Sequence, residues 1–73
     1  MQIYNRVGFE ELDDEAEFPV IYAVVNRLEE GDNLLRVFAN RQDAFDYAHI
    51  EADLNELDLY FVIERELIPA GML

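Results

Sequence analysis

A run of β-branched and aromatic residues from Val20 to Leu28 constrains the fold of this chain more than any other feature. Such residues are enriched in strands, because their side chains pack well on a pleated surface. The next five residues, 29–33, are polar apart from Gly31, which is free to adopt a positive φ angle. A second apolar run then covers residues 34–39. This pattern predicts a β-hairpin over residues 20–39.

A helix is predicted over residues 40–55, directly after the hairpin. Asn40 is a favourable N-cap residue, and Asp43 complements the positive end of the helix dipole. Apolar residues then recur at helical spacing. They are Ala44, Phe45, Ala48 and Ala52, with Tyr47, Ile50 and Leu54 widening the stripe. Residues 59–68 alternate again and predict a C-terminal strand.

These elements predict an α+β fold: a small antiparallel sheet of three or four strands, in β-β-α-β order, with one main helix packed on one face. We expect one domain over residues 1–73, because a chain of this length supports a single core that buries only about 60% of its unfolded surface. Residues 1–19 form an N-terminal arm, in which the acidic segment is expected to be a short helix or a loop. The alternative for the start of this arm is a short edge strand that contains Ile3, Tyr4, Val7 and Phe9.

The residue types that are missing exclude most catalytic chemistry. The chain contains no Cys, Ser, Thr, Lys or Trp. It therefore has no Ser or Cys triad, no Schiff-base lysine, no thiolate zinc site and no Walker loop. Carboxylate pairs remain, but 17 acidic residues guarantee such pairs by chance. We expect a protein that is not an enzyme and that needs no cofactor.

The charge indicates what kind of partner the protein binds. Five arginines against 17 acidic residues give a net charge of −12. Phosphates of nucleic acids and anionic lipid surfaces are repelled by such a chain, so neither is expected as a direct ligand. The expected partner is the basic surface of a nucleic-acid-binding protein or complex. No apolar run approaches the ~20 residues of a membrane span and no signal peptide is visible, so we expect the cytoplasm of a bacterial host cell.

The acidic residues occur in three tracts that a small fold can bring onto one surface. Such a surface can imitate the phosphate rows of a nucleic acid and occupy a basic groove. The alternatives are a charged surface that serves solubility alone, or adaptation to a saline cytoplasm. The candidate partner-binding residues are Glu10, Glu11, Asp13, Asp14, Glu15, Glu17, Glu29, Glu30, Asp32, Asp43 and Asp46, together with Tyr22 and Tyr60.

Tyr22 and Tyr60 are included because strand alternation places them with polar residues, on the sheet face predicted to point away from the helix. With Val24, Phe38 and Val62 they would form an interaction patch or a homodimer interface. The other possibility is that the N-terminal arm covers this patch. A small homo-oligomeric structural or regulatory module is therefore the alternative function.

A divalent-metal site is a further alternative. His49 and Asp53 lie four residues apart on the predicted helix, and Asp46 lies three residues before His49. This spacing places three potential ligands on neighbouring turns. A lone histidine on a helix is more often an ordinary surface residue, so no metal is predicted.

The three acidic tracts give the chain a resemblance to one group of known proteins. The tracts are Glu10–Glu17, Glu29–Asp32 and Asp43–Asp58. A short, strongly acidic chain of simple α+β pattern resembles the small phage-encoded anti-defence proteins of the anti-CRISPR and DNA-mimic anti-restriction type. The resemblance lies in composition and covers no family motif, so no family residue is transferred to this chain. It implies a stoichiometric inhibitor that blocks the groove where nucleic acid enters a host complex.

Overall fold

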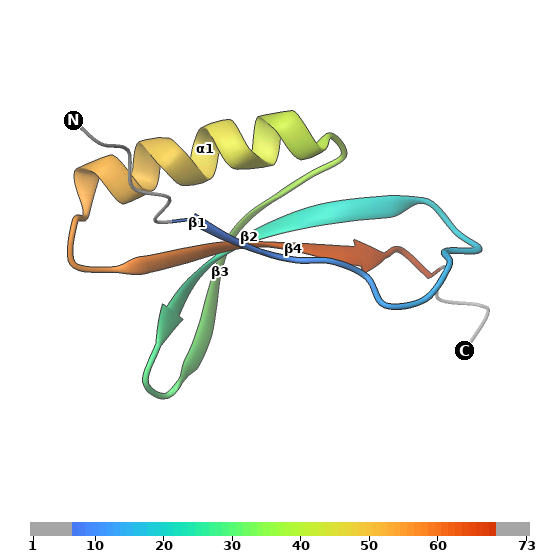
Figure 1. Ribbon diagram of the computed structural model, residues 1–73, viewed down its shortest axis with the longest axis horizontal. Helices are drawn as coiled ribbons and strands as arrows, with labels where there is room; N and C mark the ends of the chain where they lie inside the picture. Colours follow the sequence, from blue (N-terminus) through green and yellow to red (C-terminus); the bar gives the residue numbers. More distant parts are fainter. Residues whose placement is uncertain (1–6, 69–73) are drawn as a thin grey trace.

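The computed structural model describes residues 7–68, which form a four-stranded sheet with one helix packed against it (Figure 1). The predicted α+β architecture is confirmed. The elements in chain order are β1 (Val7–Glu10), β2 (Val20–Leu28), β3 (Gly31–Phe38), α1 (Arg41–Leu54) and β4 (Leu59–Glu66). Ile3 and Tyr4, considered for an edge strand, lie outside the described residues. Val7 and Phe9 lie within β1, so the edge-strand alternative is correct for this part of the arm.

The strand order is β1-β4-β2-β3, and the sheet is mixed rather than wholly antiparallel. β2 is antiparallel to both β3 and β4, as expected, but β1 pairs with β4 in parallel. The reason is that β4 lies between β1 and β2. β1 and β2 run in opposite directions, and the connection between them passes the C-terminal end of β4.

The hairpin turn is tighter than predicted. Leu28 pairs with Gly31, so only Glu29 and Glu30 connect β2 to β3, and β3 begins three residues earlier than Leu34. Gly31 has a φ angle of 134°, a conformation that other residues rarely adopt. A bulge between Val24 and Val25 shifts the register of the hairpin.

The helix has the predicted bounds and the predicted cap. Oδ1 of Asn40 accepts hydrogen bonds from the backbone amides of Gln42 (2.8 Å) and Asp43 (3.3 Å). The buried face of α1 consists of small residues, which bring the helix close to the sheet; they are Ala44, Ala48 and Ala52. Ile50 and Leu54 do not widen this face, because they are 58% and 72% exposed.

The helix covers the sheet face that was predicted to be open. Val24 and Val62 are 0% exposed and Tyr60 is 2% exposed, and all three belong to one cluster with the helix alanines. Tyr22 and Phe38 are half-buried and pack against the same cluster. The predicted tyrosine patch is therefore wrong: alternation correctly groups these residues, but their face is the core.

The opposite face has a smaller apolar layer of its own. Val25 and Ile63 are 5% and 6% exposed, although no helix of residues 7–68 lies on this side. The guanidinium of Arg27 lies 4.0 Å from the ring centroid of Phe61 and shields part of this layer. A Cβ atom at Gly8 would overlap the Phe61 ring, so only glycine lets β1 approach β4 here.

Candidate functional site

The densest group of acidic side chains lies on the loop that connects β1 to β2, residues 11–19, which we call the acidic loop. The segment is a loop rather than the short helix that was the other expectation. Leu12, Ala16 and Phe18 are half-buried. The acidic residues between them are all exposed; they are Glu11, Asp13, Asp14, Glu15 and Glu17. The loop thus presents its carboxylates to solvent.

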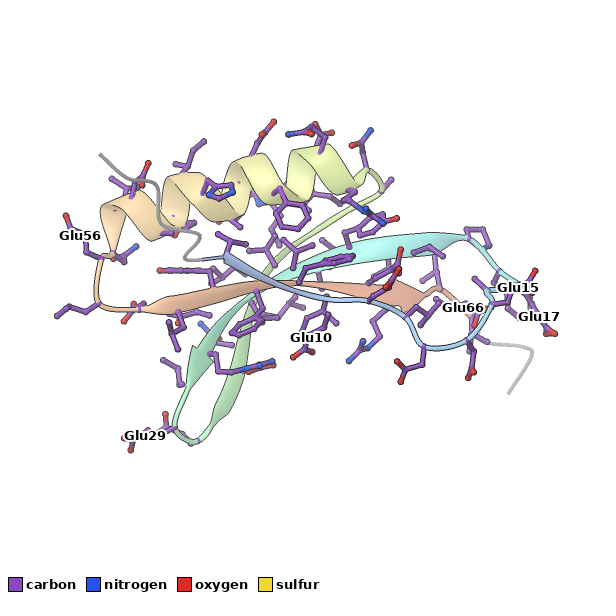
Figure 2. The ribbon with its side chains drawn as sticks, in the orientation of Figure 1. Glu10, Glu15, Glu17, Glu29, Glu56 and Glu66 are labelled. Atoms are coloured by element: carbon purple, nitrogen blue, oxygen red, sulfur yellow. The ribbon has the colours of Figure 1, made fainter. Side chains whose placement is uncertain are left out.

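Glu66 at the end of β4 holds the second half of this loop. Its Oε2 atom accepts hydrogen bonds from the backbone amides of Glu17 (2.6 Å) and Phe18 (2.7 Å). The amide of Leu67 donates to the carbonyl of Pro19 (2.8 Å) and closes the base of the loop. In Figure 2, Glu15, Glu17 and Glu66 lie together at one end of the molecule.

Glu64 holds the first half of the loop. Its Oε1 atom accepts from the backbone amide of Leu12 (3.0 Å), and its Oε2 atom accepts from the hydroxyl of Tyr22 (3.1 Å). Arg41 lies 3.8 Å from the same Oε2 atom, and the Glu64 side chain is only 14% exposed. We call Glu64 and Glu66 together the carboxylate clasp.

The sequence analysis did not single out the clasp. A signal was present, because Glu64 and Glu66 share the strand face of Tyr60 and Val62. Acidic residues that follow the period of a core face need hydrogen-bond donors. The donors come from a segment about fifty residues earlier in the chain, which strand alternation alone does not identify.

Glu10 and Asp32 were predicted to contact a partner, but both bind Arg27. Asp32 receives two hydrogen bonds, from Nε at 2.7 Å and from Nη2 at 2.8 Å, and Glu10 accepts from Nη1 at 3.0 Å. The hydrogen bond from Arg27 lowers the pKa of the Asp32 carboxyl. Hydrogen bonds from Asp32 and then Glu10 raise the pKa of Arg27 above its usual range. These two carboxylates are used within the fold.

The remaining acidic candidates lie on other elements of the fold. Glu29 and Glu30 are exposed at the tip of the hairpin, and Asp43 and Asp46 are exposed on α1. Asp46 also accepts a hydrogen bond from Gln42 at 2.9 Å. Figure 2 shows Glu29 at the hairpin tip and Glu56 at the end of the molecule opposite Glu15. The fold therefore distributes the acidic residues over several regions of a molecule 46 Å long.

Each arginine in the described part of the chain has a contact within the fold. Arg27 binds Glu10 and Asp32, and Arg65 donates to the carbonyl of Glu64 at 3.1 Å. Arg36 lies over Tyr47 and Arg41 over Phe9, at 5.4 and 4.8 Å from the ring centroids. Among residues 7–68, no ion pair involves a carboxylate of the acidic loop.

Within residues 7–68, the geometry gives little support to other kinds of site. No three His, Cys, Asp or Glu side chains there are grouped as metal ligands, and Asp46, His49 and Asp53 do not form such a group. A shallow hollow of about 290 Å³ is lined by residues 55–58 at the turn after α1. None of the helices in the described residues is long and apolar enough to cross a membrane.

Comparisons with protein-family models, with curated proteins and with solved structures find no match to this chain.

Proposed function

We propose that the protein is a non-enzymatic acidic binding protein that occupies the basic, nucleic-acid-binding groove of another protein. The observation that carries this proposal is the acidic loop. Its backbone amides at Leu12, Glu17 and Phe18 point inward onto the carboxylate clasp, while its own carboxylates point to solvent. A charged tail that served solubility alone would need no such attachment.

The energetics of the proposed binding resemble those of DNA in the same groove. Carboxylates that face Lys and Arg clusters displace the anions bound there and steer the encounter. Because the backbone of the loop is held before binding, less backbone conformational entropy is lost on association. Inhibition would follow from occupancy alone, as for the phage-encoded anti-defence proteins that the chain resembles in composition.

The first experiment identifies the partner. The purified protein is immobilised, bacterial lysate is passed over it at low salt, and bound proteins are eluted by a salt step. We expect a basic nucleic-acid-processing protein that is also displaced by competing DNA or RNA. A captured protein that DNA and RNA do not displace would contradict the proposed mimicry.

A matched pair of variants then separates a defined surface from net charge. Glu15→Gln/Glu17→Gln and Glu29→Gln/Glu30→Gln each remove two exposed negative charges. We expect the acidic-loop variant to weaken binding to the captured partner about tenfold, and the hairpin variant to weaken it less. Equal losses would show that binding depends on net charge and not on the acidic loop.

A homo-oligomeric module is a second candidate function, favoured by the open edge of the sheet. β3 is an edge strand of eight residues, on which Leu34 and Val37 are 59% and 47% exposed. Long apolar edge strands pair readily with other chains. This candidate predicts a defined dimer at micromolar concentration in sedimentation, which Val37→Lys dissociates; a strict monomer contradicts it.

A further inference from the structure

The turn that joins α1 to β4 exposes an unusual amount of apolar side chain. Leu57 is 98% exposed, Leu54 72% and Leu59 54%, and Ile50 on the last turns of the helix is 58% exposed. We call these four residues the leucine turn. Single exposed apolar residues are common on protein surfaces, but a group of four within ten residues is typical of a contact surface.

Helical geometry explains why two of these residues point outward. Ala44, Ala48 and Ala52 define the buried face of α1. At 100° per residue, Ile50 lies about opposite that face, on the same side as Asp46 and Asp53, and Leu54 lies about 40° from Ile50. The outer face of the helix thus combines apolar and acidic side chains, and the leucine turn continues it.

Acidic residues predominate along the sequence around the leucine turn, although Arg27 of β2 pairs with Leu59 in the sheet and binds Glu10 and Asp32. The chain has no Lys or Arg between Arg41 and Arg65. Within residues 50–59 it has four acidic residues, which are Glu51, Asp53, Glu56 and Asp58. An apolar centre with a negative rim is complementary to an apolar pocket with a positive rim. A second copy of this chain does not offer such a pocket at its own leucine turn, because that turn has the same negative charge.

We propose that the leucine turn is a specificity anchor, in which Leu57 enters an apolar pocket beside basic residues on the partner protein. This inference rests on the proposed function and gives the protein a second contact with the same partner. The acidic loop supplies charge, which any basic surface satisfies, whereas Leu57 requires a pocket of matching shape. A few well-packed residues contribute most of the binding energy of an interface, and an apolar side chain in a matching pocket is one way to supply it.

Two peptides of equal charge serve as probes, one alternating Arg with Leu and one alternating Arg with Gln. Binding to the isotopically labelled protein is followed by NMR, which reports affinity and the amides that shift. The variants are Leu57→Gln and, as a control, Leu34→Gln on β3, where Leu34 is 59% exposed. Because Leu57 is 98% exposed, its substitution removes no packing, and the unfolding midpoint should not change.

We expect the Arg–Leu peptide to bind about tenfold more tightly than the Arg–Gln peptide and to shift amides of residues 54–59. Leu57→Gln should abolish this difference, and Leu34→Gln should preserve it. Equal binding of both peptides to the unaltered protein overturns the anchor but leaves the proposed function intact. Failure of both peptides to bind contradicts the proposed function as well. A dimer of the free protein that Leu57→Gln dissociates overturns the anchor in favour of self-association.

Discussion

The backbone amide of Phe18 donates a hydrogen bond to Oε2 of Glu66 at 2.7 Å, across 48 positions of sequence. The amide of Glu17 donates to the same oxygen at 2.6 Å. A carboxylate that accepts hydrogen bonds from two backbone amides holds the loop more strongly at that point than one neutral acceptor does. The acidic loop is thereby part of the folded domain, and it is attached by another acidic residue and not by a cation.

Replacing Glu66 should release the second half of the acidic loop. Glu66→Ala leaves the amides of Glu17 and Phe18 without their acceptor, whereas Glu66→Gln keeps one side-chain oxygen. We expect the exchange of these two amides with solvent to accelerate about fivefold or more in the alanine variant, and less in the glutamine variant. Amide hydrogen exchange by NMR measures this directly. Unchanged protection in Glu66→Ala would show that the loop is held by its apolar residues instead.

Glu64 should contribute more to overall stability, because its side chain is only 14% exposed. Glu64→Ala removes the acceptor of the Leu12 amide and of the Tyr22 hydroxyl, and we expect a loss of about 1–3 kcal/mol in the free energy of unfolding. Tyr22→Phe removes only the hydroxyl donor and should cost about 1 kcal/mol or less. Urea unfolding of both variants provides the comparison. If Tyr22→Phe proves as costly as Glu64→Ala, the Leu12 contact contributes nothing.

Gly8→Ala should destabilise the pairing of β1 with β4. The added methyl group overlaps the Phe61 ring, and relief requires that the ring or the strand move. Overpacking of this kind costs about 1–3 kcal/mol. The double variant Gly8→Ala/Phe61→Leu tests the cause, since the smaller side chain should recover part of the loss. Thermal unfolding of these two variants and of Phe61→Leu alone completes a double-mutant cycle. If the effects of the two single substitutions simply add in the double variant, the contact with Phe61 is not the cause of the lost stability.

The Arg27–Asp32 pair predicts a pH dependence at the hairpin tip. The pKa of Asp32 is lowered by its hydrogen bond to Arg27. A lowered carboxyl pKa stabilises the fold at pH values above the unfolded pKa, and this contribution is lost as the pH falls through the folded pKa. In NMR titrations, Asp32 should titrate below the ordinary aspartate range, and Arg27→Gln should return it toward that range. An Asp32 pKa that Arg27→Gln leaves unchanged would contradict the assigned cause.

The sequence by itself determined the local elements of this protein. Asn40 caps the helix through the amides of Gln42 and Asp43, which are two and three residues away. The helix and the last two strands begin and end within a few residues of their predicted bounds, and the alternation of Tyr60 with Phe61 correctly separates two sheet faces. These features depend on interactions between near neighbours, so propensity and periodicity suffice to predict them.

Only the tertiary structure decided which face became the core and where the acidic loop lies. Alternation divides a strand into two faces but does not say which face a helix covers, and here the alanines of α1 lie on Tyr60 and Val62. β1 pairs with β4 because Gly8 leaves room for Phe61, a contact between residues far apart in sequence. Glu64 and Glu66 reach the acidic loop only because β4 lies between β1 and β2. Such contacts depend on the order of strands, which local sequence does not encode.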